Sequence, residues 1–139
     1  MTDPGSYSIH PIGVVRSELH RREDAPRQGD EGGADAWLEI DPRFIDALDG
    51  IVPNSEVLIL TWLHLARRDV LKVRRRRHAD NRLMGVFATR SPDRPNPIGL
   101  HKVTVVEIDG YRLKVRPLEA LDGTPVIDIK PILPEAQKA

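Results

Sequence analysis

Short runs of apolar residues alternate along this chain with turns rich in Gly, Pro, Asp and Asn, a pattern typical of short β-strands. The pattern predicts strands at residues 9–16, 37–40, 57–65, 100–108, 111–115 and 126–130. Residues 57–65 are almost wholly apolar, which indicates a strand buried on both faces, with residues 70–73 as a possible continuation. Pro11 and Gly13 interrupt the first run, so we expect an edge or bulged strand there.

The later runs carry finer predictions. Residues 86–88 are expected to form a short apolar strand, and Asp109-Gly110 predicts a two-residue hairpin turn. The last run alternates, which places Val126, Asp128 and Lys130 on one face and Ile127 and Ile129 on the other.

One short helix is expected after the second run. Asp41 is a suitable N-cap, Pro42 suits the first helical position, and Gly50 ends the segment. Six or seven strands, one helix and no βαβ alternation predict a mainly β fold, a small and mostly antiparallel β-barrel. We expect one barrel domain at residues 9–134, with a frayed N-terminus at 1–8 and a tail at 135–139.

The composition narrows the classes of function. Lys+Arg and Asp+Glu number 21 each, yet the eight basic residues between 67 and 82 exceed Asp69 and Asp80 by six, so the remainder nets −6. The absence of cysteine excludes disulfides and thiolate chemistry, and the five histidines lack metal-ligand spacing, so no metal site is expected. We expect a soluble, cytoplasmic protein because no signal peptide or membrane-length apolar run is present.

The segment GVFATRSPDRPNPIG, residues 85–99, is the first candidate binding element. Its three prolines within six residues restrict the backbone, so Arg90, Arg94 and Asn96 are held with little left to order on binding. Arginine offers donors suited to carboxylates, phosphates and base edges. The alternative is a proline-rich connector with solvated charges.

Three other features remain open on sequence alone. Pro26, Arg27 and Gln28 lie in a long polar segment, residues 17–36, which is either functional or mobile coil. His64 lies in the apolar run 57–65 and is either a satisfied core residue or a ligand. The run Arg74, Arg75, Arg76 and Arg77 is either a phosphate contact or a solvated face.

Two long motifs, GVFATRSPDRPNPIGL and LDGTPVIDIKP, with PRQ upstream, resemble the TsaA-like (TrmO) family from about Ile9 to Pro134. The resemblance implies a barrel that binds S-adenosyl-L-methionine, acts as a homodimer with the cofactor near the interface, and methylates tRNA. The family's reaction is methylation of N6 of threonylcarbamoyladenosine beside the anticodon. By matching positions, the implied cofactor contacts are Pro26, Arg27, Gln28, His64, Leu65, Arg90, Leu100, Leu121, Asp122, Gly123 and Thr124.

Methyl transfer from a sulfonium requires alignment of the nucleophile and no covalent intermediate on the protein. A carboxylate that accepts the proton of the target nitrogen would help, and Asp122 and Asp128 are the candidates. For Asp128 the alternative is an inter-strand salt bridge with neighbours of Lys130. The predicted substrate contacts are Arg94, Asn96, Arg74, Arg75, Arg76, Arg77 and Lys130. Two alternatives remain: methyl transfer to another substrate, and a barrel that binds RNA or a nucleotide without catalysis.

Overall fold

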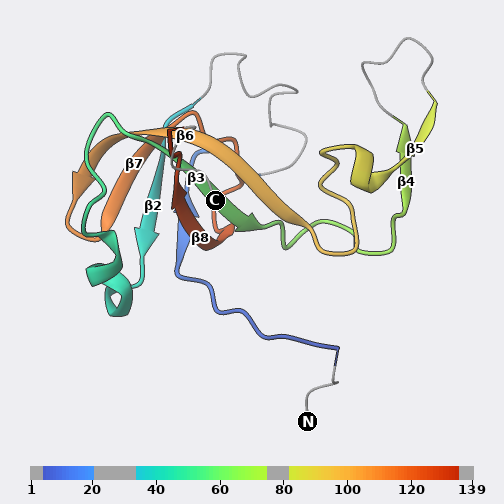
Figure 1. Ribbon diagram of the computed structural model, residues 1–139, viewed down its shortest axis with the longest axis horizontal. Coiled ribbons are helices and arrows are strands. Elements are labelled where there is room, and N and C mark those ends of the chain that lie inside the picture. The colour runs from blue at the N-terminus through green and yellow to red at the C-terminus, as the bar shows by residue number, and fades with distance from the viewer. Residues whose placement is uncertain (1–4, 21–33, 75–81, 135–139) are drawn as a thin grey trace.

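The computed structural model describes residues 5–20, 34–74 and 82–134 of the chain. Six of the eight strands in these ranges form a closed barrel, in which neighbours are antiparallel and the order is β1-β2-β7-β6-β3-β8 (Figure 1). Their bounds are β1 Gly13–Arg16, β2 Ala36–Ile40, β3 Glu56–Trp62, β6 Ile98–Asp109, β7 Arg112–Arg116 and β8 Pro125–Pro131. The prediction of a mainly β, antiparallel barrel with one short helix is confirmed.

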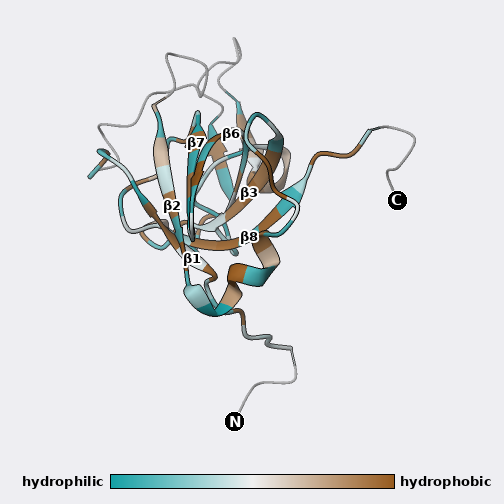
Figure 2. Cartoon of the chain, turned by 90° about the vertical axis from the view of Figure 1, so that its left-hand side faces the viewer, coloured by the Kyte–Doolittle hydropathy of each residue, from teal (hydrophilic) through white to brown (hydrophobic). Residues whose placement is uncertain are grey.

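The barrel interior is the hydrophobic core. The strands alternate between residues that face this core and residues that face outward, as the bands of hydropathy in Figure 2 indicate. The buried core residues are Val15, Ala36, Leu38, Ile40, Val57, Ile59, Val103, Val105, Leu113, Val115, Leu118, Ala120 and Val126. The expectation that residues 57–65 are buried on both faces is wrong: Val57, Ile59 and Thr61 are buried, whereas Leu58, Leu60 and Trp62 are partly exposed on the outer wall.

Strand β1 pairs with β2 on one side and with β8 on the other in registers without a shift, so it is not the edge or bulged strand expected from Pro11 and Gly13. The strand begins only at Gly13, after the proline. A Cβ at Gly13 would lie 2.4 Å from the backbone oxygen of Glu39, and glycine is therefore required by the close approach of β2.

A β-bulge in the pairing of β3 with β8 corrects the predicted faces of the last strand. Leu60 pairs with Asp128 and Thr61 pairs with Val126, so one extra residue of β8 lies between the two pairs. Val126 consequently lies in the core and the partly buried Ile129 packs against it, although strict alternation places the two on opposite faces.

The 3₁₀ helix η2, Pro42–Leu48, lies across one end of the barrel, and Phe44 and Leu48 pack against the core (Figure 2). Its predicted start is confirmed, because a carboxylate oxygen of Asp41 accepts a hydrogen bond from the backbone N–H of Arg43 at 2.9 Å. The β6–β7 hairpin turns through Gly110 and Tyr111, one position later than predicted, and Gly110 has a φ of +63°.

Residues 63–97 leave the barrel between β3 and β6 as an extension that we name the arm (Figure 1). The arm contains a separate two-stranded sheet, β4 Lys72–Arg74 with β5 Leu83–Gly85, and the 3₁₀ turn η3, Val86–Ala88. Two predictions are wrong here. Residues 86–88 are not a strand, and residues 70–73 do not continue β3 because a turn at residues 64–65 follows it.

Candidate functional site

Three connections leave the barrel at the same end, which we name the loop end. The registers of β3 with β6 and β8 put the C-terminal end of β3 beside the N-terminal ends of both partners. The registers of β1 with β2 and of β2 with β7 place the C-terminal ends of β1 and β7 beside the N-terminal end of β2, also at this end. The connections 17–35, 63–97 and 117–124 therefore leave and re-enter the barrel at this end, and η2 lies at the other. Every predicted cofactor contact except Leu100 belongs to these segments, and Leu100 lies two residues into β6.

The turn Leu121–Thr124 leads into β8. The backbone N–H and the hydroxyl of Thr124 both donate to the carbonyl of Leu121, at 3.0 and 2.7 Å, and Thr124 is buried. Gly123 has a φ of +89°, and a Cβ built there meets no atom of the described residues within 4 Å. The backbone at Gly123 is thus open to the approach of a ligand.

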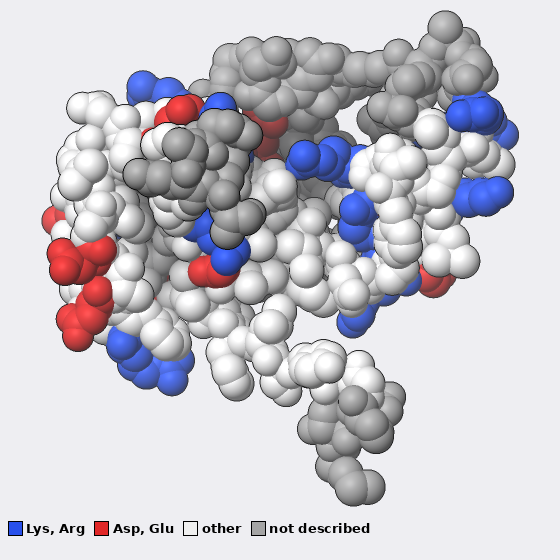
Figure 3. All heavy atoms as spheres, in the orientation of Figure 1, with Lys and Arg blue, Asp and Glu red and all other residues white. Residues whose placement is uncertain are grey.

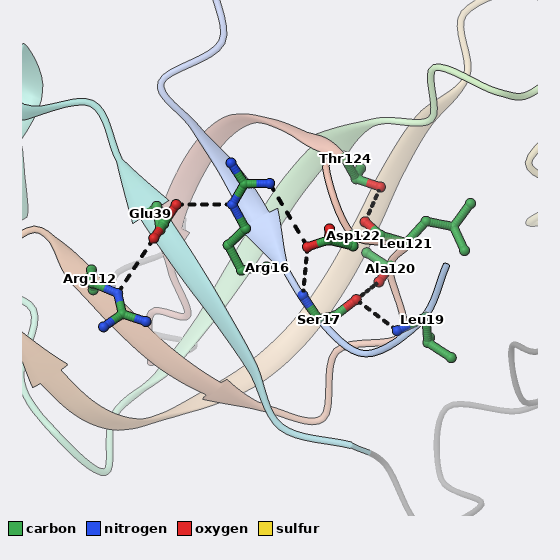
Figure 4. Close-up of polar contacts among 9 residues, drawn as sticks. All are labelled: Arg16, Ser17, Leu19, Glu39, Arg112, Ala120, Leu121, Asp122 and Thr124. Carbon is green, nitrogen blue, oxygen red and sulfur yellow. Dashed lines mark hydrogen bonds and ion pairs between the residues drawn. The ribbon is translucent and has the colours of Figure 1, made fainter. Parts of the chain in front are cut away.

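The same turn is bound to the chain that leaves β1 (Figure 4). The backbone N–H of Ser17 donates to Oδ1 of Asp122 at 3.1 Å, and its hydroxyl donates to the carbonyl of Ala120 at 2.7 Å. The N–H of Asp122 donates to the carbonyl of Leu19 at 2.7 Å. Arg16 lies 3.9 Å from the same carboxylate oxygen.

The segment that follows Ser17 returns to the barrel beside the same turn. The N–H of Leu118 donates to the carbonyl of Ala34 at 3.1 Å. A hydrogen bond from Arg116, together with the charges of Arg116 and Lys114, lowers the pKa of the Asp35 carboxyl. Pro26, Arg27 and Gln28 lie outside the described residues, so only the two ends of their segment are placed.

The sequence predicts that Arg94 contacts the substrate, but in the structure its side chain is bound to the arm itself. Its guanidinium donates to the carbonyls of Val86 and Thr89, the latter at 2.6 Å. The backbone N–H of Arg94 donates to the carbonyl of Arg67 at 3.0 Å. These bonds fasten the proline segment to η3 and to the start of the arm. The prediction missed this because a guanidinium can also satisfy backbone carbonyls that leave a 3₁₀ turn.

Asn96 is held by Arg68 from the other side of the arm. Arg68 lies 5.1 Å over the ring of Trp62, donates from Nε to the carbonyl of Pro95 at 2.7 Å, and donates from Nη2 to Oδ1 of Asn96 at 2.9 Å. The amide nitrogen of Asn96, which is exposed, is left as the outward donor. Arg68 was not singled out from the sequence, because nothing in the basic run distinguishes it.

Arg90 is exposed, and within the described residues its guanidinium has no hydrogen-bond or ion-pair partner. His64 and Leu65 are exposed in the turn that follows β3. The interpretation of His64 as a satisfied core residue is therefore wrong. Arg90, His64 and Leu65 therefore present exposed side chains on the arm.

Asp128, Lys130 and Leu100 lie on the outer wall of the barrel. Leu60 of β3 pairs with Leu100 on one side and with Asp128 on the other, so the two are separated by a single strand. Oδ1 of Asp128 accepts from the N–H of Ile129 at 2.8 Å, and Oδ2 lies 3.6 Å from Nζ of Lys130. This ion pair lies within β8, so it differs from the inter-strand salt bridge considered as the alternative role of Asp128.

His101 is a feature of the interior that the sequence did not reveal. It faces inward on β6, where its Nε2 lies 2.9 Å from the hydroxyl of the fully buried Thr61. Burial lowers the pKa of His101 from 6.5 to about 4, so the ring is neutral at pH 7. A Cβ at Gly99 would lie 2.4 Å from this hydroxyl and 2.8 Å from Nε2, and Gly99 therefore makes room for the pair. The only sequence signal was a glycine two residues before a histidine in a strand.

We expect this histidine to make stability depend on pH. Between pH 6.5 and 4 the unfolded chain binds one more proton than the folded chain, so stability is complete above pH 6.5 and falls as the pH is lowered. The loss between pH 7 and pH 5 should be about 2 kcal/mol in urea unfolding. His101→Gln should remove most of this difference, whereas the same change at the exposed His10 should preserve it. An identical pH dependence in His101→Gln and the parent would contradict the assignment.

The charges are unevenly distributed over the molecule. In Figure 3 basic side chains gather along the arm, whereas a group of acidic ones lies on the far side of the barrel from it. Arg74 is exposed at the end of β4, and Arg75, Arg76 and Arg77 lie outside the described residues. A basic arm beside the loop end is suited to a polyanionic partner.

Two further properties concern the described ranges. No group of three or more His, Cys, Asp or Glu side chains in them is placed to hold a metal ion. No helix in residues 5–20, 34–74 and 82–134 has both the length and the apolar character needed to cross a bilayer.

Comparison with known proteins identifies the family of this chain. The family model described as tRNA-methyltransferase O N-terminal domain matches residues 14–138. The chain belongs to this family. The TrmO match confirms the resemblance carried by the motifs GVFATRSPDRPNPIGL and LDGTPVIDIKP, which supply the arm segment and the turn at the loop end.

Two archaeal proteins and one crystal structure illustrate the relationship. An S-adenosyl-L-methionine-binding protein of Archaeoglobus fulgidus is 46% identical over 127 residues, 91% of this chain and 90% of that protein. A "Probable S-adenosyl-L-methionine-binding protein" of Methanothermobacter thermautotrophicus is 50% identical over 123 residues, 88% of each chain. TrmO from Pseudomonas aeruginosa superposes with a TM-score of 0.77 at 34% identity, over 99% of this chain. The chain spans 60% of that crystallised TrmO.

Proposed function

We propose that this protein is an S-adenosyl-L-methionine-dependent methyltransferase that acts on tRNA, at N6 of threonylcarbamoyladenosine in the anticodon loop. The observation that carries the proposal is the common position of the three motif-bearing segments at the loop end. It is supported by membership of the TrmO family and by the named cofactor of the archaeal relatives.

The residues at the loop end suit this cofactor. The backbone at Gly123 is open to close approach of the nucleoside, and the guanidinium of Arg90, which has no partner within the described residues, suits the methionyl carboxylate. Leu65 and Leu100 supply exposed apolar surface and His64 an exposed imidazole. The segment with Pro26, Arg27 and Gln28 begins beside the turn and ends beside Leu118.

The cofactor supplies a methyl group on a positively charged sulfur, which an in-line displacement transfers. The protein has to hold the target nitrogen about 3–3.5 Å from the methyl carbon and aligned with it. The proton of that nitrogen needs an acceptor, and Asp122 and Asp128 are the available carboxylates of the predicted site. Asp128 forms an ion pair with the exposed Lys130. The ammonium group of Lys130 suits contact with the substrate at the outer wall.

The substrate side is the arm. Arg74 is exposed and the amide of Asn96 faces outward, so both suit contact with phosphates or bases, together with Arg75, Arg76 and Arg77. The bonds of Arg94 to Val86 and Thr89 support an indirect role for Arg94, which shapes the segment that presents Arg90.

The protein is proposed to act as a homodimer in which a second copy covers the arm. An isolated two-stranded hairpin is only marginally stable in water, yet β4 and β5 form such a sheet apart from the barrel. Phe87, which is 85% exposed, and Leu71 and Leu65 present apolar surface on this arm.

Replacement of Phe87 tests the assembly. In sedimentation, we expect the parent chain to be a dimer and Phe87→Glu to shift it towards monomer, with at least tenfold weaker self-association, because the charge would be desolvated at the interface. Tyr7→Glu, at an equally exposed aromatic residue outside the arm, should leave the dimer unchanged. A parent that sediments as a monomer would contradict the assembly.

The reaction is tested with a labelled methyl donor. Purified protein should transfer the methyl group to tRNA that carries threonylcarbamoyladenosine and not to the unmodified transcript, with mass spectrometry of the nucleosides as the readout. Binding of S-adenosyl-L-methionine without transfer to this tRNA would favour another methyl acceptor. Salt-sensitive RNA affinity that persists in Arg90→Ala, with no cofactor binding, would favour a non-catalytic RNA-binding barrel.

A further inference from the structure

The hydrogen bonds between β1 and the turn Leu121–Thr124 continue beyond the barrel ladder. The paired register of β1 with β8 ends at Val14 and Pro125. Past that pair, Val15 exchanges bonds with Thr124 and Gly123, at 2.9 and 2.7 Å. Beyond Val15 the contacts are made by the side chains of Ser17 and Asp122 together with neighbouring backbone groups. We name this set the Ser17–Asp122 clasp.

The clasp is reciprocal. The carboxylate of Asp122 accepts the N–H of Ser17, while the N–H of Asp122 donates to the carbonyl of Leu19 two residues further on. The hydroxyl of Ser17 donates to the carbonyl of Ala120 and accepts from the N–H of Leu19 at 3.2 Å. Two side chains therefore fasten the chain after β1 to Ala120, just before the turn, and to Asp122 within it, as Figure 4 shows.

We propose that Ser17 and Asp122 are positioning residues that hold the turn Leu121–Thr124 in its cofactor-binding conformation, and that the Asp122 carboxylate is not the proton acceptor of methyl transfer. The inference rests on the proposed cofactor site at this turn.

The direction of the Asp122 side chain carries the second part of the inference. Its Oδ1 receives the Ser17 N–H at 3.1 Å and lies 3.9 Å from the Arg16 guanidinium, so the carboxylate points toward the chain leaving β1 (Figure 4). A general base must reach the proton that it removes. Arg16 is itself held by Glu39, at 3.0 Å, which fixes the cation beside Asp122.

The need for the clasp follows from the turn. Gly123 has a positive φ, and glycine at that position restricts the backbone less than any other residue. A turn without side-chain anchors would have to be ordered at each binding event, which lowers affinity. Anchoring by Ser17 and Asp122 removes that requirement before the cofactor arrives.

The test uses titration calorimetry of the full chain with S-adenosylhomocysteine, the demethylated cofactor. Asp122→Ala and Ser17→Ala should each weaken binding about tenfold. Asp122→Asn should stay within about threefold of the parent, because the amide oxygen still accepts the Ser17 N–H. Glu39→Gln, which alters the other carboxylate partner of Arg16 on the barrel wall, should bind as the parent does. Thermal midpoints check that each variant is folded. If Asp122→Ala does not fold, the affinity of Ser17→Ala still tests the inference.

Equal losses in Asp122→Asn and Asp122→Ala would overturn the inference, since the charge itself would then matter. Unchanged affinity in both Ser17→Ala and Asp122→Ala would also overturn it. For transfer to tRNA, the inference requires Asp122→Asn to retain its rate and its pH profile when the cofactor is saturating; a hundredfold lower rate would identify a base. If the parent binds S-adenosylhomocysteine and the variants follow the expected order without any transfer to tRNA, the clasp stands and the proposed reaction fails.

Discussion

Arg90→Ala should weaken binding of S-adenosyl-L-methionine by about 10- to 100-fold and leave the fold intact. The guanidinium is exposed and unpartnered within the described residues, so its removal breaks no internal bond. Hydrogen bonds to charged groups contribute about 1.5–3 kcal/mol, which corresponds to this loss. Titration calorimetry measures the affinity, and the thermal midpoint should change by no more than that of a typical surface substitution.

Arg67→Ala is the matched control for Arg90. Both arginines belong to the arm and are exposed, but the Arg67 guanidinium already pairs with Asp69, at 2.9 and 3.0 Å. Its loss should change cofactor affinity less than twofold. Arg90→Lys should be intermediate, because lysine keeps the charge and loses the planar pair of donors. Equal effects at Arg67 and Arg90 would show that the arm acts only through its net charge.

Gly99→Ala should destabilise the protein by about 2–3 kcal/mol. The new Cβ would lie 2.4 Å from Oγ1 of Thr61, 2.8 Å from Nε2 of His101 and 3.2 Å from Cδ2 of Leu63. The first two atoms form the part-buried Thr61–His101 hydrogen bond and cannot move apart from the new Cβ without breaking it. The melting temperature should fall by roughly 6–15 °C in differential scanning calorimetry.

A double-mutant cycle identifies the cause of that loss. Thr61→Ala removes the nearest clashing atom, so Gly99→Ala should cost at least 1 kcal/mol less in that background than in the parent. Gly5→Ala is the control, because nothing lies within 4 Å of a Cβ at that position. Strict additivity of the two substitutions would show that crowding by the Thr61 hydroxyl is not the reason.

The strands were largely predictable because their apolar residues recur with a short period. Residues 37–40 and 100–108 correspond closely to β2 and β6. The predictions of burial were wrong where a strand pairs with two neighbours and its outer face is also covered by apolar residues. Residues 57–65 read as doubly buried because Leu58, Leu60 and Trp62 cover an outer wall beside Leu100, which local hydrophobicity does not distinguish from a second core.

The candidate site was likewise predictable only in part. The motifs located the arm segment and the Leu121–Thr124 turn, but the sequence assigned Arg94 to the substrate and left Arg68 without a role, whereas the fold uses both to hold the arm. Arg94 is bound to backbone carbonyls, Arg68 is stacked on Trp62, and Arg90 is left exposed. Nothing in their neighbours along the chain distinguishes the three, because the distinction depends on residues brought close by folding.

By itself, the sequence determined the class of fold, the absence of thiol chemistry, the start of η2 at Asp41 and the two motifs that identify the family. These properties depend on residue type and local spacing. Only the tertiary structure decided that the barrel closes through β1 and β8, that β8 is bulged, and that His101 lies against Thr61. It also decided that the connections 17–35, 63–97 and 117–124 leave and re-enter the barrel at one end. The physical reason is that strand register and closure are set by pairing between distant segments, which a pattern of nearest neighbours does not contain.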